Sequence, residues 1–189
     1  MSADPLPLFT ESAPWTVTSE RVVLATSRPF EFIDVTPHVV DLVRRSGLTH
    51  GLVNVQTRHT TTAVVVNEHE PLLIDDIEER LKRWAPEWAS YRHDDLRLRT
   101  VNLEEEERPN GHAHARAVVL GTSESVNVAD GALQLGKWQR IFFVELDGGR
   151  PRSVSLVAMG VRGAASGSCV SIAPRRQARA SETGAARCG

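Results

Sequence analysis

The amino-acid sequence predicts an α+β protein that is mainly β: a compact antiparallel β sandwich with flanking helices. Three observations lead to this fold class. Segments rich in Val and Thr dominate the chain, and such residues favour the pleated strand. Only two segments show helical periodicity, so most strands need no helical crossover and can pair antiparallel. The chain has 189 residues, 41% of them hydrophobic, which is enough to bury the core of one domain.

The N-terminal part begins with strands and a helix. Residues 15–27 (WTVTSERVVLATS) predict one or two strands, and residues 30–35 (FEFIDV) predict another. A helix is expected next because Thr36 can cap it, Pro37 suits its first helical position and Gly47 suits the position just past its end.

The rest of the chain continues the strand signal around a second helix. Residues 51–68 are β-rich, and a strand is expected at 58–67. Pro71 and Pro86 bracket the second helix, whose apolar residues recur at helical spacing: Leu73, Ile77, Leu81 and Trp84. Three more strands are expected, at 112–120, 138–146 and 152–161.

The two ends of the chain differ from its centre. We expect an N-terminal arm at residues 1–19, one folded domain at 20–162 and a disordered basic tail at 163–189. The tail is rich in Ala, Ser, Gly and Arg and has no aromatic residue. A composition of this kind cannot bury a core.

Charge, hydropathy and cysteine usage exclude several classes of protein. The formal net charge of −2 gives no nucleic-acid footprint. No apolar run approaches the roughly 20 residues that span a bilayer, and the N-terminus lacks a secretory signal. Both cysteines, Cys169 and Cys188, lie in the tail, which argues against a disulfide framework. We therefore expect a cytoplasmic protein with no nucleic-acid or membrane partner.

Histidines on predicted strand faces suggest a metal site. In a strand at 112–120, His112, His114 and Arg116 would share one face, with small alanines behind them. Two imidazoles on alternate residues can bind one metal ion, and His59 in the strand at 58–67 is the natural third ligand. Three imidazoles predict a divalent metal, zinc first, with magnesium or manganese as alternatives. The competing interpretation is that these histidines lie on a solvated sheet face.

Arginines and carboxylates supply the other candidate groups. Arg116, Arg150 and Arg152 could bind phosphate through bidentate guanidinium contacts, although surface pairing with the acidic run at 104–107 is an alternative. Glu145 and Asp147 are candidates for general base or metal ligand. The alternative for Asp147 is a simple turn in the sequence "DGG".

Four further residues complete the candidate site. Asn67 and Glu68 end an apolar strand, although Glu68 could instead complement the dipole of the following helix. His93 is followed by Asp94, which could orient its ring. Gln139 shares a strand face with Glu145.

Six segments occur in an order that resembles a known family: "HTTTAVVVNE", "PLLIDDIEERL", "YRHDD", "NGHAHARAVVLG", "DGALQLGKWQRIFFVELDG" and "RPRSVSLVAMG". Together they resemble the secondary thiamine-phosphate synthase enzymes, the YjbQ-like proteins, over residues 20–161. The resemblance implies the YjbQ-like fold, a homotrimer, and a weak ability to make thiamine phosphate. That reaction joins a pyrimidine diphosphate to a thiazole phosphate and releases pyrophosphate.

The resemblance also places individual residues in family motifs. His59 opens the His-Thr-Thr motif, and His112 and His114 lie near the family's "N-x-H-x-H"-like strand. The remaining matches are Asn67-Glu68, His93-Asp94, Trp138-Gln139 and the Glu145-x-Asp147-Gly turn. The sequence "DGGRPR" departs from the family pattern by an inserted glycine before Arg150 and Arg152.

Two classes of function follow from these residues. The first is a metal-assisted transferase acting on a small phosphorylated substrate. In this enzyme histidines hold the metal, arginines bind phosphate, and Glu145 or Asp147 acts as the general acid or base. A metal-dependent phosphate-ester hydrolase would use the same parts. The second is a non-catalytic trimer that binds a metal or a small ligand.

Removal of the tail tests the predicted domain boundary. Because residues 163–189 cannot bury a core, a chain truncated at Gly163 should melt within about a degree of the full chain. Thermal unfolding followed by circular dichroism measures this. A loss of several degrees would show that the tail packs on the folded domain.

Overall fold

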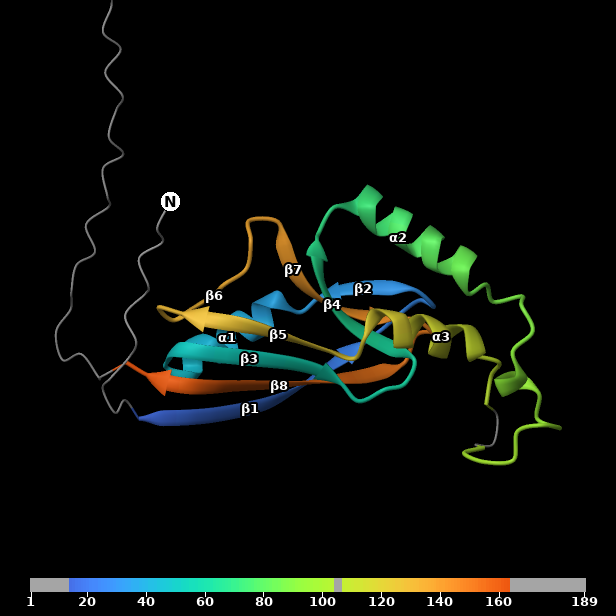
Figure 1. Ribbon diagram of the computed structural model, residues 1–189, viewed down its shortest axis with the longest axis horizontal. Helices are drawn as coiled ribbons and strands as arrows, with labels where there is room; N and C mark the ends of the chain where they lie inside the picture. The colour runs from blue at the N-terminus through green and yellow to red at the C-terminus, as the bar shows by residue number, and fades with distance from the viewer. Residues whose placement is uncertain (1–13, 104–106, 164–189) are drawn as a thin grey trace, which may run out of the picture.

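The computed structural model describes residues 14–103 and 107–163, and two stacked antiparallel sheets form its body (Figure 1). The larger sheet has the strand order β1-β8-β3-β5-β6. Its strands are β1 (Trp15–Ala25), β8 (Pro151–Arg162), β3 (Leu48–Thr57), β5 (Ser123–Ala129) and β6 (Ala132–Leu133). The smaller sheet consists of β2 (Glu31–Asp34), β7 (Gln139–Glu145) and β4 (Thr62–Glu68), with β7 in the centre. The predicted antiparallel, mainly β sandwich is confirmed.

The main core lies between the two sheets. Ile141 and Phe143 of β7 point into it and pack with Val53 and Val55 of β3 and with Leu156 of β8. The helix α1 (Thr36–Ser46) adds three apolar residues to the same cluster: Val39, Leu42 and Val43. The strands alternate as expected, because successive side chains of a strand point to opposite faces.

A second apolar cluster covers the outer face of the smaller sheet. Phe142 and Val144, the alternate residues of β7, pack there against Ala113 and Ala117 of helix α3 (Gly111–Leu120). Methyl side chains let a helix approach a sheet closely. The helix α2 (Pro71–Trp84) runs along the outside of the molecule beyond the end of β4 (Figure 1), and none of its residues is buried.

The predicted strand at 112–120 is wrong, because this segment forms α3. Asp94 Oδ1 accepts hydrogen bonds from the backbone N–H groups of Asn110 and Gly111, at 3.0 and 2.9 Å, and so satisfies donors at the start of the helix. Alanine is also the best helix former. Residues two apart are separated by about 200° around a helix, so His112 and His114 do not share a face.

Both predicted helices are confirmed, with one change at the start of the first. Gly47 ends α1 in the left-handed conformation, with φ 68°, as expected. Thr36 is the first helical residue and not its cap: its Oγ1 accepts a hydrogen bond of 2.8 Å from the N–H of Ile141. That bond joins α1 to β7.

The domain boundaries need one correction. β1 begins at Trp15, so residues 15–19, expected in the arm, belong to the larger sheet. The predicted tail lies outside the described residues apart from Gly163. Within residues 14–103 and 107–163, no helix is both long enough and apolar enough to span a membrane.

At one end of the sandwich the chain crosses several times between the sheets, and a buried ion pair joins two of these crossings, the one from β3 to β4 and the one from β7 to β8. Glu145, at the end of β7, is fully buried and accepts hydrogen bonds from Nε and Nη2 of Arg152, each 2.7 Å long. Its carboxylate also accepts the N–H groups of residues 146–148 and the Thr26 hydroxyl. Arg152 Nη2 donates to Thr61 Oγ1, at 3.1 Å, in the other crossing. One carboxylate therefore fixes the strand ends around it.

Loss of this carboxylate charge should destabilise the whole fold. Glu145→Gln leaves the buried Arg152 guanidinium without its counter-charge, which should lower the free energy of unfolding by about 3–5 kcal/mol. Urea denaturation measures the change. Glu79→Gln is the control, because it removes an exposed Glu–Arg pair of α2 and should leave stability almost unchanged. Equal effects of the two substitutions would contradict the structural role of Glu145.

Candidate functional site

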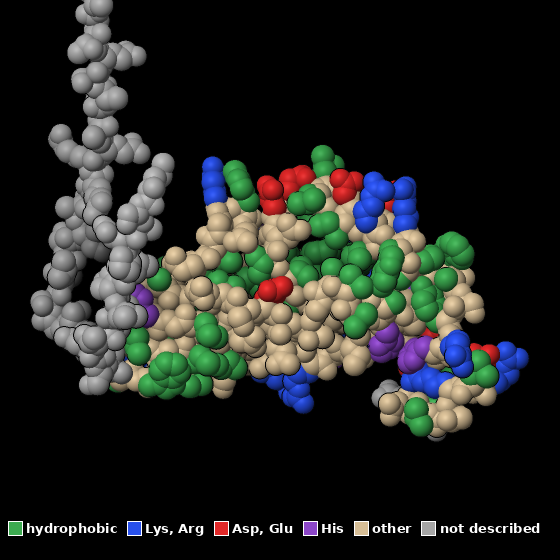
Figure 2. Space-filling view, viewed as in Figure 1, with side chains coloured by type: hydrophobic (Ala, Val, Ile, Leu, Met, Phe, Trp, Pro, Cys, Tyr) green, Lys and Arg blue, Asp and Glu red, His purple; other side chains and the backbone are tan. Residues whose placement is uncertain are grey.

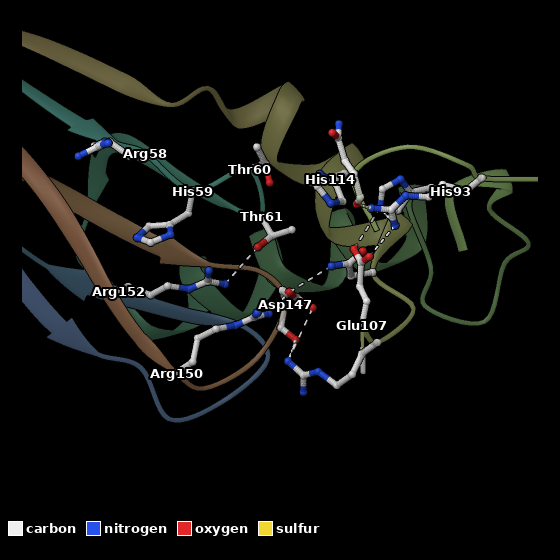
Figure 3. Close-up of a pocket in the computed structure, with 14 residues that line it drawn as sticks. Arg58, His59, Thr60, Thr61, His93, Glu107, His114, Asp147, Arg150 and Arg152 are labelled. Atoms are coloured by element: carbon white, nitrogen blue, oxygen red, sulfur yellow. Dashed lines mark hydrogen bonds and ion pairs between the residues drawn. The ribbon is translucent and has the colours of Figure 1, made fainter. Parts of the chain in front are cut away.

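A cavity of about 540 Å³ opens beside the two crossings between the sheets (Figure 3). It is lined by the β3–β4 crossing, the β7–β8 crossing, the start of β8, the start of α3, and the segment from the short 3₁₀ helix η1 (Arg92–Asp94) onward. Histidines and basic side chains gather at this end of the molecule (Figure 2). Residues from three stretches of the chain, 58–61, 93–114 and 147–152, thus meet in one place.

Positive charge exceeds negative charge in this cavity. Two of the lining residues are carboxylates, Glu107 and Asp147. Five are arginines: Arg58, Arg99, Arg108, Arg150 and Arg152. If Glu145 behind Arg152 is included, five positive charges face three negative ones, and the excess is two. A concave surface with an excess of one sign attracts a ligand of the other sign.

Carboxylates hold most of these arginines in place. Arg150 pairs with Asp147, and Arg108 Nη2 lies 3.9 Å from the same carboxylate. Arg99 Nη1 lies 2.9 Å from Glu107 Oε2. Arg58 differs, because it forms no hydrogen bond or ion pair with the described residues. The guanidinium groups of the paired arginines are therefore oriented before any ligand arrives, which lowers the entropy cost of binding.

His59 is held in one tautomer by the backbone. Its Nε2 accepts the N–H of Ser153 at 3.1 Å, so the neutral ring carries its proton on Nδ1. Burial lowers the pKa of His59, and the positive charge of Arg152 lowers it further, whereas Glu145 raises it. His59 is thus a neutral hydrogen-bond donor near pH 7. Because its Nε2 lone pair is already engaged, it is poorly suited to ligate a metal.

His93 and His114 form a second histidine wall of the cavity. Their ring centroids lie 4.6 Å apart in an edge-on arrangement. Arg99 Nη1 donates to His93 Nε2 at 3.2 Å. Burial lowers the pKa of His114, and the electrostatic interactions with His93 and Arg99 act in the same direction. This wall is therefore tied to Arg99 and, through it, to Glu107.

Asn110 offers an acceptor inside the cavity. Its side chain is 8% exposed, and Nδ2 donates to Asp147 at 3.4 Å. Its Oδ1 is buried and makes no hydrogen bond within the described residues. A buried carbonyl oxygen without a donor is costly, and this one is closed to solvent, so a donor group of a ligand could reach and stabilise it only if the Asn110 side chain turned toward the cavity.

Several predicted site residues meet in this cavity. His59, His93, His114, Asp147, Arg150 and Arg152 line it, and Glu145 lies directly behind Arg152. Glu145 is not an available base, because its two oxygens already accept six hydrogen bonds.

The predicted metal triad is not brought together. His59 and His114 line the cavity, but His112 does not, and its ring centroid lies 6.4 Å from that of Tyr91. Burial lowers the pKa of His112, and so does the charge of Arg116. In the part of the chain that the structure describes, no group of three or more His, Cys, Asp or Glu is placed to hold a metal ion. The shared strand face assumed for the triad does not exist.

Arg116 does not reach the cavity either. It is fully buried, and its Nε and Nη2 donate to the carbonyl oxygen of Ala85 at 3.0 and 2.7 Å. Ala85 is the residue that caps the C-terminal end of α2. A cation there satisfies a free carbonyl and complements the helix dipole. Burial lowers the pKa of Arg116, and Glu87 opposes this shift. Its role is to join α3 to α2.

Three predicted residues lie at the opposite end of the smaller sheet. Thr62 pairs with Glu145 near the cavity, whereas Glu68 pairs with Gln139 six residues further along, or about 20 Å away. Gln139 Oε1 accepts the N–H of Gly136, and Asn67 Oδ1 accepts the N–H of Glu68. Within this chain, Asn67, Glu68 and Gln139 therefore shape the strand ends and do not reach the cavity.

The sequence interpretation missed three of the five cavity arginines. Arg58 stands next to His59 and could have been found by that adjacency. Arg99 and Arg108 lie on either side of the acidic run, in a segment without helical or strand periodicity. No local pattern indicates that such a segment folds back over the crossings.

The comparisons with known proteins agree with this fold. The family described as "UPF0047 protein YjbQ-like" matches residues 20–161. A UPF0047 protein of Methanothermobacter thermautotrophicus is 40% identical over 144 residues, which are 76% of this chain and 93% of the relative. One of Archaeoglobus fulgidus is 41% identical over 139 residues, covering 74% and 99% of the two chains.

Solved structures show the same architecture. A crystal structure from Sulfolobus solfataricus has a TM-score of 0.70 at 33% identity, and covers 78% of this chain and 99% of the other. A YjbQ/UPF0047 family protein of Clostridium acetobutylicum has a TM-score of 0.65, also at 33% identity, with coverages of 74% and 98%. This chain belongs to the YjbQ-like UPF0047 family.

Proposed function

We propose that the cavity binds the phosphate groups of a small phosphorylated substrate, and that the protein is a thiamine-phosphate-synthase-like transferase. The observation that carries the proposal is the excess of oriented arginine charge in the cavity. Guanidinium groups bind phosphate oxygens bidentately and keep their charge at any physiological pH. The resemblance of the sequence motifs supplies the reaction type.

In such a reaction, a pyrimidine diphosphate and a thiazole phosphate are the two substrates. The bond between the pyrimidine methylene carbon and the diphosphate oxygen breaks, and pyrophosphate leaves with the electron pair. The thiazole nitrogen forms the new carbon–nitrogen bond with its lone pair. Arg150, Arg152 and the Nδ1–H of His59 would stabilise the charge that develops on the leaving pyrophosphate. Asn110 Oδ1 would accept a hydrogen bond from the amino group of the pyrimidine once its side chain turned toward the cavity.

This chemistry suits the carboxylates of the cavity better than hydrolysis does. The thiazole nitrogen attacks without losing a proton, so transfer needs no general base. A hydrolase needs a base for its water. Glu145 is saturated with hydrogen bonds, and Asp147 is paired with Arg150. These two carboxylates are therefore better suited to transfer than to hydrolysis.

A magnesium ion bound to the diphosphate is part of the proposed substrate. A phosphate monoester carries about −1.5 to −2 charges near pH 7, and a diphosphate ester carries more, so it exceeds the two excess positive charges of the cavity. Magnesium is usually held by substrate phosphates with one or two carboxylates and needs no histidine cluster. Asp147, which lines the cavity and pairs with Arg150, is the carboxylate that we propose as its ligand.

We also propose the homotrimer that the resemblance implies. The exposed fractions of Leu72 and Trp84 in α2 are 72% and 56%, and no residue of α2 is buried. A neighbouring subunit would cover these apolar side chains, because large exposed apolar surfaces are typical of protein interfaces.

Removal of one cavity arginine tests the transferase directly. Arg150→Gln should lower kcat/KM for thiamine phosphate formation about a hundredfold, because it removes a cation from the leaving group. Chromatography of the product with the two purified substrates measures the rate. Arg44→Gln is the control, since Arg44 is an exposed, ion-paired arginine of α1 outside the cavity.

Three results would contradict this proposal. If the wild-type protein binds pyrophosphate but forms no product, it is a binding protein. If it releases pyrophosphate equally fast without the thiazole phosphate, it is a hydrolase. An equal loss of activity in Arg150→Gln and Arg44→Gln would show that the cavity is not the site of the reaction.

The metal requirement is a separate prediction. We expect turnover to stop with EDTA and to return with magnesium, and we expect protein without a histidine tag to lack stoichiometric zinc. Elemental analysis and the activity assay measure both. Tightly bound zinc at one equivalent per chain, lost on His114→Gln, would instead support a histidine metal site.

A further inference from the structure

A shallow groove of about 270 Å³ adjoins the cavity on the outer face of the larger sheet. Its lining residues come from β1, from β8 and from the β3–β4 crossing: Ser19, Glu20, Arg21, Arg58, Ser153 and Ser155. Arg58 lines both the groove and the cavity. The two hollows therefore share a side chain.

The strand register brings the donors of the groove together. Arg21 of β1 lies directly opposite Ser155 of β8, and Ser153 is two residues further along the same strand face. Ser153 also donates its backbone N–H to His59, which lines the cavity. Arg21 is close enough to His59 for its charge to lower the pKa of that ring. The hydroxyls of the groove and the arginines of the cavity are therefore neighbours, joined by His59 and by the step from Arg152 to Ser153.

The charge of the groove is available to a ligand. Neither Arg21 nor Arg58 forms an ion pair with the described residues, in contrast to the four other arginines of the cavity. Glu20 is the one acidic residue of the groove, and its carboxylate is already paired with Arg45. Two arginines with three hydroxyl donors match the oxygens of a phosphate monoester.

We propose that this groove is a second anion subsite that binds the phosphate monoester of the acceptor substrate. The proposal rests on the proposed function, since a transferase with two phosphorylated substrates needs two places for phosphate. The larger cavity then takes the diphosphate, and the smaller groove takes the monophosphate. Their shared wall at Arg58 and His59 sets the acceptor ring against the carbon that loses pyrophosphate.

Calorimetric titration of the full chain at 0.15 M salt tests the proposal with two probes, inorganic pyrophosphate and the thiazole phosphate monoester. Arg21→Gln should weaken binding of the monoester about tenfold and change pyrophosphate binding less than about twofold. Arg150→Gln should do the reverse. Arg44→Gln, the control, should change neither. All three arginines are at least partly exposed, and circular dichroism checks that each variant folds.

The outcomes separate the two proposals. The subsite is overturned if the wild-type chain fails to bind the monoester, if Arg21→Gln behaves like Arg44→Gln, or if Arg21→Gln weakens both probes equally. If the monoester depends on Arg21 while pyrophosphate does not bind at all, the subsite stands and the proposed role of the cavity fails.

Discussion

The buried contact between Glu145 and Arg152 is the interaction on which the rest of the site depends. It joins the end of β7 to the start of β8 and, through Thr61, to the crossing from β3 to β4. Removing the charged partner of a buried arginine is strongly destabilising, because it leaves an uncompensated buried charge. Because Glu145 holds two of its nitrogens, the guanidinium stays at the cavity wall, where a phosphate can meet it. The residue that looked most like a catalytic base therefore acts by orienting a cation.

The same principle applies to the other arginines of the cavity. Asp147 and Glu107 hold Arg150 and Arg99 in place, and the net charge remains positive because arginines outnumber carboxylates. A cavity with fixed guanidinium groups stabilises developing negative charge without reorganising. Arg58 is the exception, since it has no carboxylate partner among the described residues and lies between the cavity and the groove. Its position would let it contact both of the proposed substrates.

Local patterns predicted β1, β2, β7, β8 and two helices well, but they missed β5, placed the start of β4 too early and failed for the histidine segment. In β7, apolar residues occupy both alternating sets, Ile141 with Phe143 and Phe142 with Val144. This pattern indicates a strand buried on both faces, and the structure has that strand. The run "HAHARAVV" also alternates, but its alanines favour a helix, and the decisive contact is long-range: Asp94 caps the helix start from sixteen residues away. Short-range periodicity cannot report such a contact. The cavity was only half predictable for the same reason, because Arg99 and Arg108 reach it from a segment without a pattern.

A crystal structure of the protein grown with thiamine phosphate and magnesium pyrophosphate tests the central claim most directly. The account predicts pyrophosphate between Arg150, Arg152 and the Nδ1 atom of His59, with the ring of the other product beside Asn110. The central claim would be contradicted if pyrophosphate bound elsewhere and the cavity arginines still contacted only their carboxylate partners.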